Sequence, residues 1–344
     1  MKVKYQKEDI FRIARRNAME KCILFQAEID ITSACNAKCF FCYQGDCHKV
    51  KKNELSTEEV ENLLDELKAM GCYYVSFIGG EPFMRKDMLD ILEYAKKIGL
   101  LISVVTNLQL LNEEQIFRIC DIGVDRISVS FHSVNPDKYC KIFGVDERYY
   151  NVAMHNIKLL IEKNVNIGIL VTISDMNFGE MDDIRDFFIH NGIKERNVAF
   201  NMLVSGNNEV RDRRPNKEYE NILRNGNVPV ESILTKSEVF TCTAGKISCS
   251  INSVGDVFPC TFMNCPAGNI REESLKYIWE KSHFMQFVRS TREEHFPRCN
   301  RCKNRFYCHV CMANNLNETG LYNIPHEEYC DFRKMLTRSL INEC

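Results

Sequence analysis

Two hydrophobic periods alternate along the first two-thirds of the chain. Short apolar runs typical of strands are followed by segments in which apolar side chains recur every three or four residues, as on one face of a helix. The segment 56–71 is helical by this criterion, with Ser56 and Glu59 as a capping box at its start and Gly71 at its end. The short apolar runs predict six strands, at 25–31, 73–78, 100–105, 125–131, 166–173 and 197–204.

The alternation of these elements predicts the fold class. Strands separated by helices of about a dozen residues pair in parallel through right-handed crossovers. Six such units predict an α/β fold, a partial (β/α)6 barrel of the TIM type. In such barrels the chemistry lies at the C-terminal ends of the strands. Four of the predicted strands end in polar or glycine-rich stretches: 31–47, 79–82, 106–107 and 130–133.

The regular pattern ends near Gly206, and four regions are expected. These are a helical N-terminal extension at 1–22, the partial barrel at 23–207, a linker or bridging region at 208–238 and a cysteine-dense domain at 239–344. Regular secondary structure is expected to be sparse in the last region. Bound metal is therefore expected to stabilise this loop-rich domain.

Composition narrows the class of protein. The 344 residues include 45 basic and 47 acidic side chains, a net charge of −2 that gives no electrostatic reason to bind nucleic acid or an anionic membrane surface. No run of about 18 apolar residues predicts a membrane span, and the charged N-terminus lacks the apolar core of a signal peptide. A cytoplasmic location is expected, where the 18 cysteines stay reduced and clusters of them bind metal.

Three cysteines lie close together in the loop after the first predicted strand. Cys35, Cys39 and Cys42 have the spacing C-x3-C-x2-C, so their thiolates can face one centre. Three thiolates are one fewer than a closed zinc site or a fully ligated four-iron cluster requires. Such a set leaves one iron open to an outside ligand. Cys47, five residues later, is expected to be incidental.

With Phe41 before Cys42, and with Gly79-Gly80-Glu81-Pro82 after the second strand, the chain resembles the radical S-adenosylmethionine (SAM) superfamily. The resemblance implies that Cys35, Cys39 and Cys42 hold a [4Fe–4S] cluster whose open iron binds SAM. It also implies reductive cleavage of SAM to a 5′-deoxyadenosyl radical, which abstracts a hydrogen atom from the substrate.

The resemblance further implies contacts with SAM at the strand ends. Glycines allow the backbone to approach the ligand closely, and Glu81 can accept from its ammonium group. His132 stands where many relatives carry an acidic residue. Ordinary strand-end capping is the alternative at 106, 107, 130 and 132, and packing against the loop is the alternative for Tyr43. The expected contacts are Tyr43, Gly79, Gly80, Glu81, Pro82, Thr106, Asn107, Ser130 and His132.

The C-terminal cysteines resemble the SPASM extension of radical SAM enzymes, which holds auxiliary iron–sulfur clusters. The run 299–311 has the spacing C-x2-C-x5-C-x2-C, one residue shorter in its last gap than the usual family run. A zinc domain is the alternative, but the five-residue gap is too short for a zinc ribbon.

Three [4Fe–4S] clusters are implied in all. The two auxiliary sets are Cys242, Cys249, Cys260 and Cys311, and Cys299, Cys302, Cys308 and Cys330. Cys265 or an open iron is the alternative to Cys249.

The resemblance to SPASM enzymes implies a peptide-modifying maturase that crosslinks or oxidises a ribosomally made precursor peptide. Its expected partners are a precursor peptide or protein substrate, an electron donor such as flavodoxin or ferredoxin, and, where the chain does not itself recognise the peptide, a separate recognition protein. Neither nucleic acid nor a membrane is an expected partner.

Three alternatives to this activity stay open. A sulfatase-type maturase commonly has an acidic base directly after the cysteine corresponding to Cys260, where this chain has Thr261. A small-molecule dehydrogenase of cofactor biosynthesis and a non-catalytic redox protein are the others. The sequence assigns no general base. Glu180, Asp182 and Asp183 follow the fifth strand, but a solvated helix N-terminus explains them equally well.

Overall fold

One open sheet organises the molecule. The computed structural model describes residues 7–44, 52–203, 214, 242–308 and 310–341. Its nine strands have the order β6-β5-β4-β3-β2-β1-β7-β8-β9. The strands are β1 (Gln26–Asp30), β2 (Tyr74–Ile78), β3 (Leu101–Thr106), β4 (Arg126–Ser130), β5 (Ile167–Ile173), β6 (Val198–Met202), β7 (Ser248–Ile251), β8 (Asp256–Phe258) and β9 (Gly268–Asn269).

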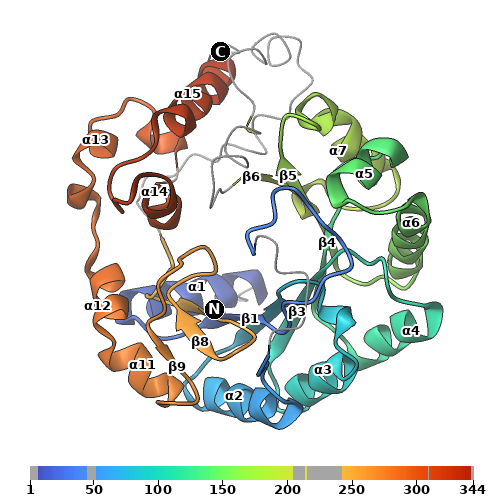
Figure 1. The fold of residues 1–344 in the computed structure, drawn as a ribbon, viewed down its shortest axis with the longest axis horizontal. Coiled ribbons are helices and arrows are strands. Elements are labelled where there is room, and N and C mark those ends of the chain that lie inside the picture. The colour runs from blue at the N-terminus through green and yellow to red at the C-terminus, as the bar shows by residue number, and fades with distance from the viewer. Residues whose placement is uncertain (1–6, 45–51, 204–213, 215–241, 309, 342–344) are drawn as a thin grey trace, which may run out of the picture.

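The helices surround the strands as a ring (Figure 1). The longer ones are α1 (Lys7–Lys21), α2 (Thr57–Ala69), α3 (Met88–Lys97), α4 (Glu113–Ile122), α5 (Pro136–Phe143), α6 (Glu147–Glu162), α7 (Met181–His190), α11 (Leu275–Lys281), α12 (His283–Ser290), α14 (Met312–Thr319) and α15 (Glu327–Ile341). The short ones are η1 (Pro82–Met84), η2 (Phe178–Glu180), η3 (Glu195–Asn197), η5 (Glu293–His295), α13 (Pro297–Asn300) and η6 (Arg305–Tyr307). No helix in these described ranges combines the length and apolarity needed to cross a membrane.

The prediction of six parallel strands is confirmed. Strands β1 to β6 pair in parallel with their neighbours in chain order, and the linear strand order makes this a partial barrel that stays open. The capping box of α2 is also confirmed, since Ser56 and Glu59 each satisfy a backbone N–H of the other. The cysteine loop and the polar stretches that follow β2, β3 and β4 therefore lie at one edge of the sheet.

The C-terminal region extends the same sheet. Strand β7 pairs in parallel with β1, from Gln26 opposite Ser248 to Ile29 opposite Ile251, and β8 and β9 add two antiparallel strands. These strands, and the C-terminal helices from α11 onward, were not predicted. Of the expected linker 208–238 only Arg214 is described, and Cys47 lies outside the described residues.

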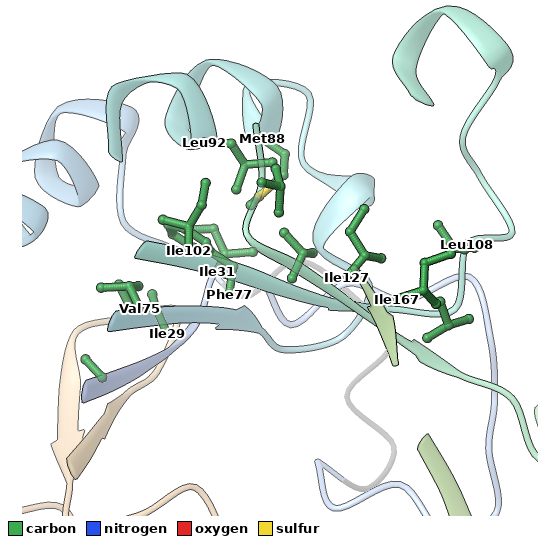
Figure 2. Packing of buried hydrophobic residues seen from close by; sticks show 14 of the residues in the cluster. Ile29, Ile31, Val75, Phe77, Met88, Leu92, Ile102, Leu108, Ile127 and Ile167 are labelled. Atoms are coloured by element: carbon green, nitrogen blue, oxygen red, sulfur yellow. The ribbon is translucent and has the colours of Figure 1, made fainter. Parts of the chain in front are cut away.

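The hydrophobic core lies between the sheet and its helices. In β1, Ala27 and Ile29 are almost fully buried, while Glu28 between them lines a cavity on the other face. Figure 2 shows Ile29 and its neighbours on the strands below Met88 and Leu92, which come from α3. Because side chains alternate across a strand, the core holds one face of β1 and leaves the other for polar chemistry.

Candidate active site

The cysteine loop that follows β1 is held by hydrogen bonds at both ends. Near its start, Ser33 donates from its backbone N–H and its hydroxyl to Glu54 Oε1, at 2.8 and 2.7 Å. Farther on, the N–H of Lys38 donates to the carbonyl of Phe143 over 2.7 Å. These contacts fix a loop that has little regular structure of its own.

Cys35, Cys39 and Cys42 line one cavity of about 500 Å³. Burial raises the pKa of Cys35 to about 11. The pKa of Cys39 is raised further, first by burial and then by the neighbouring Cys42 and Cys35. Among the described residues that line the cavity there is no lysine or arginine to stabilise a thiolate. This is a donor set that an iron cluster, which carries its own positive charge, would ionise.

The two glycines after β2 are required by the cysteine loop itself. A Cβ on Gly79, whose φ is +131°, would lie 2.5 Å from the carbonyl oxygen of Thr32, and one on Gly80 would lie 2.6 Å from the carbonyl carbon of Ala34. The N–H of Gly80 donates to the Thr32 carbonyl, and that of Glu81 to the Ala34 carbonyl, both over 2.8 Å. The sequence predicts these glycines for close approach of a ligand. The structure shows that they also let two backbone segments touch.

Glu81 connects the ends of β2 and β3. Its carboxylate is 1% exposed and accepts from the Thr106 hydroxyl at 2.7 Å, the Asn107 N–H at 2.8 Å and the Phe83 N–H at 3.2 Å. Burial raises the pKa of Glu81 to about 7 against these hydrogen bonds. The Asn107 side chain donates to Asn36 Oδ1 over 2.9 Å, back in the cysteine loop. The structure thus gives these three predicted SAM contacts partners within the protein.

His132, after β4, is a neutral buried base. Its Nδ1 accepts from the Thr172 N–H at 3.1 Å, so the proton of the neutral ring is on Nε2. The ring stacks on Phe143 at 4.8 Å and meets Phe41 edge-on at 4.9 Å. Burial lowers the pKa of His132 to about 3. His132 therefore offers the cavity a hydrogen-bond donor rather than a charge.

Two aromatic side chains bring the two halves of the chain together at the cavity. Tyr43, next to Cys42, donates from its hydroxyl to Asp30 Oδ1 over 3.0 Å. Its ring meets Phe262 edge-on, with centroids 5.8 Å apart. Phe262 and its neighbour Thr261 line the same cavity as the cysteine loop. The structure thus gathers the three loop cysteines and the predicted SAM contacts around one space, with the exception of Pro82, which begins η1 and does not line it.

The C-terminal cysteines form two groups. Cys242, Cys260 and Cys311 pack against one small apolar cluster, which Cys299 also contacts. Burial, followed by the neighbouring Cys311 and then Cys242, raises the pKa of Cys260 to about 12. The second group lines a separate cavity, where burial and then the other thiols of the group raise the pKa of its first member to about 11. This group consists of Cys299, Cys302, Cys308 and Cys330. Cys311 lines the same cavity, but the thiol that raises its pKa is that of Cys242 in the first group.

Cys249 does not join the first group. It lies on β7 in register with Ala27, is 1% exposed, and belongs to the main hydrophobic core between sheet and helices. The neighbouring thiol that raises the pKa of Cys249 is that of Cys72, which is also buried in that core. Cys265, the alternative ligand, is exposed. The structure therefore places Cys249 apart from the other three expected ligands of the first auxiliary cluster, because side-chain alternation turns it to the other face of the sheet.

Within the described ranges, no three His, Cys, Asp or Glu side chains are grouped to hold a single metal ion.

Two family models match the chain where many of these cysteines lie. The model of the radical SAM superfamily matches residues 29–188, and that of the SPASM iron–sulfur cluster-binding domain matches residues 242–303. The chain is a radical SAM enzyme with a SPASM domain. The first match includes Cys35, Cys39 and Cys42, and the second includes Cys242 and Cys260. SAM and iron–sulfur clusters are accordingly its cofactors.

Among relatives of this radical SAM enzyme, the AdoMet-dependent heme synthase of Methanosarcina barkeri is 27% identical over 88% of this chain and 95% of its own. The PqqA peptide cyclase of Rhizobium meliloti is 25% identical over 80% of this chain and 78% of its own. The crystal structure of Streptococcus suis SuiB bound to S-adenosylmethionine shares the fold. Its TM-score is 0.72 at 18% identity, over 94% of this chain and 83% of that one.

Sequence reasoning missed one carboxylate of this radical SAM enzyme. Glu28 lines the cavity from β1, and the Thr261 hydroxyl donates to its Oε2. The alternation in "FQAEIDI" puts Glu28 and Asp30 on the face opposite Ala27 and Ile29, which was the available signal. By contrast, Glu180 accepts from Ser133 at 2.7 Å and pairs with Lys138, so it holds a loop together.

Proposed function

We propose that this radical SAM enzyme oxidises or crosslinks a ribosomally made precursor peptide. The observation that carries the proposal is the charge of the cavity. Its described wall has two carboxylates, Glu28 and Glu81, with no lysine or arginine, and His132 is neutral because burial lowers its pKa to about 3. Such a wall suits the sulfonium cation of SAM and a neutral peptide segment, and it disfavours a substrate that carries several carboxylates.

The apolar part of the wall supports a peptide in the same way. Phe41, Phe262 and Leu203 supply apolar surface, and Asn201 and Thr172 supply hydrogen-bonding side chains. A few placed polar groups in an apolar pocket are what a peptide backbone and one inserted side chain require. The PqqA peptide cyclase among the relatives agrees with this proposal. SuiB, which is 19% identical to this chain and shows the fold alone, has a crystal structure bound to precursor peptide SuiA.

In this proposal the three loop cysteines, Cys35, Cys39 and Cys42, hold a [4Fe–4S] cluster. When bound, that cluster and SAM supply a radical that removes a hydrogen atom from the substrate. The chain's own part is to orient both reactants and to keep water from the reacting atoms. The proposed contacts with SAM come from the cavity wall: Tyr43, Gly79, Gly80, Glu81, Thr106, Asn107, Ser130 and His132.

The auxiliary sites complete the proposed cofactor set. Cys299, Cys302, Cys308 and Cys330 hold one cluster with a full set of thiolates. Cys242, Cys260 and Cys311 hold the other through three thiolates of the described chain. The count is then three clusters and about twelve irons per chain. An electron donor such as flavodoxin or ferredoxin reduces the enzyme in this scheme.

A heme-forming reaction is the second candidate, favoured by the length of the match to the AdoMet-dependent heme synthase, which covers 95% of that protein. Heme precursors carry several carboxylates. The described wall of the cavity has no lysine or arginine to pair with them, so the peptide is the better match in charge.

One experiment separates the two candidates. The protein is purified without oxygen and reduced with dithionite in the presence of SAM. It is then incubated either with a pool of short synthetic peptides of varied sequence or with Fe-coproporphyrin III. Mass spectrometry should show the peptide losing hydrogen while 5′-deoxyadenosine accumulates, with no change in the porphyrin. A modified porphyrin and an unchanged peptide contradict the proposal.

A further inference from the structure

The cavity contains two carboxylates that differ in their freedom to react. Glu81 accepts three hydrogen bonds through its two oxygens and is 1% exposed. Glu28 is half-buried, and among the described residues only Thr261 donates to its carboxylate, at Oε2. Asp30, the next residue on the same face of β1, binds the side chains of Tyr43 and Gln44. Glu28 is therefore the carboxylate of this face that a substrate can reach.

The neighbours of Glu28 form a band of hydroxyl groups. On β2 its partner in register is Ser76, and on β7 it is Ser250. Ser76 accepts from Ser103 at 2.9 Å, and the Thr261 hydroxyl lies 3.2 Å from Ser250 Oγ. Hydroxyl groups of this kind can donate a hydrogen bond to a carboxylate or accept one from a protonated carboxyl group. They carry no charge that would neutralise Glu28.

Thr261 connects this carboxylate to an auxiliary site. It follows Cys260 directly in the chain, and Cys260 belongs to the group that also contains Cys242 and Cys311. One hydrogen bond and one peptide unit thus separate Glu28 from a proposed ligand of the first auxiliary cluster. The contact joins residues 233 positions apart.

We propose that Glu28 is the catalytic base that accepts a proton from the substrate as the substrate is oxidised beside the first auxiliary cluster. The inference rests on the proposed function and extends it. The substrate first loses a hydrogen atom to the 5′-deoxyadenosyl radical. It then loses a proton to the Glu28 carboxylate and an electron to the oxidised auxiliary cluster. The product has two hydrogens fewer and one new bond, so the reaction is a net two-electron oxidation.

The position of Glu28 also compensates for Thr261. An acidic residue directly after Cys260 would place its carboxylate beside the same auxiliary site. In this chain Thr261 occupies that position and carries no carboxylate. Its hydroxyl donates to the carboxylate of Glu28 on β1 and so positions it there. A base on β1 instead of in the turn after β8 still lies next to the electron acceptor, because Thr261 contacts Glu28.

The first test needs no substrate. The anaerobic holoenzyme is titrated with reductant and followed by electron paramagnetic resonance, for wild type and Glu28→Gln. Removing a negative charge beside one cluster should raise the midpoint potential of that cluster and leave the others in place, because nearby charge sets the potential. Glu272→Gln, an exposed glutamate in the turn before α11, is the matched control and should shift none. If Glu28→Gln shifts none either, the inference is overturned.

The second test measures coupling, with a synthetic peptide that the wild-type enzyme modifies as the probe. In Glu28→Gln the ratio of product to 5′-deoxyadenosine should fall about 100-fold, the low end of what a general base contributes. Deuterium from a labelled peptide should still enter 5′-deoxyadenosine, because the hydrogen atom leaves first. The double variant Glu28→Gln with Thr261→Asp restores a carboxylate next to Cys260 and should recover product.

The outcomes separate the two proposals. Product formation by Glu28→Gln at the wild-type ratio overturns the role of Glu28 and leaves the peptide function standing. Absence of product from the wild-type enzyme overturns the peptide function, and with it the role of Glu28 in that reaction. Glutamine keeps the size of glutamate and an oxygen that can accept from Thr261, so a purely structural contact would survive the substitution. The recovery by Thr261→Asp supports the inference.

Discussion

The Thr106 hydroxyl at the end of β3 donates to the Glu81 carboxylate beyond the end of β2 over 2.7 Å. This buried contact joins the ends of two neighbouring strands, and the Glu81 N–H in turn donates to the Ala34 carbonyl in the cysteine loop. Glu81→Ala should leave the Phe83 and Asn107 N–H groups without acceptors and reduce the free energy of unfolding by about 3 kcal/mol. Urea unfolding of the anaerobic holoenzyme measures this loss.

A matched control for Glu81→Ala is Glu272→Ala. Glu272 is an exposed glutamate, and its loss should change the free energy of unfolding by less than about 0.5 kcal/mol. Equal effects of the two substitutions would contradict the structural role of Glu81.

Gly80 is expected to control cluster binding through backbone contact. A methyl group there would lie 2.6 Å from the carbonyl carbon of Ala34, so Gly80→Ala should displace the cysteine loop. The purified variant should lose about four irons per chain, one cluster. Gly71→Ala is the control. Its φ is +88° with nothing within 4 Å of the added methyl, so it should cost about 1 kcal/mol of stability and retain its iron. Full iron content in Gly80→Ala would show that the loop adapts.

Cys249 and Cys260 should differ sharply in iron content. Cys260 packs with Cys242 and Cys311, so Cys260→Ala should lose or deplete one auxiliary cluster of about four irons. Cys249 is a core side chain on β7, so Cys249→Ala should keep all its iron and lose only about 1 kcal/mol of packing free energy. Anaerobic iron and sulfide assays measure both. An equal loss of iron from Cys249→Ala would show that Cys249 is a cluster ligand.

An ion pair joins the barrel to the C-terminal region. Arg271 donates to Glu59 Oε1 at 2.6 Å and Oε2 at 2.8 Å. This contact and the Ser56 N–H lower the pKa of Glu59 to about 2. Because the folded pKa is depressed, the stabilisation is present above the ordinary pKa of about 4.5 and is lost as pH falls toward 2.

Both side chains of this pair are about one-third exposed, which limits its strength. A double-mutant cycle of Glu59→Gln and Arg271→Gln at pH 7 should give a coupling of about 0.5 to 1 kcal/mol in urea unfolding. The coupling should decrease with added salt, because screening weakens partly exposed pairs. A coupling of zero at low salt would contradict the contact.

Much of the fold was predictable because its signals are local. The six barrel strands follow from apolar runs, and the start of α2 follows from Ser56 and Glu59. The grouping of Cys35, Cys39 and Cys42 follows from spacing within one loop. The SPASM cysteines were recognisable for the same reason, although spacing gave no sign that Cys249 faces the core.

The sequence alone determined which chemistry is available: a three-cysteine loop, glycines beside it and a second cysteine-rich region. Only the tertiary structure decided which side chains meet. Strand β7 returns to pair with β1, and this pairing turns Cys249 away from the cysteines beside it in sequence. It also brings Thr261 to Glu28 across 233 positions. Contacts between segments so far apart depend on the packing of the whole sheet, so local propensity and residue spacing do not predict them.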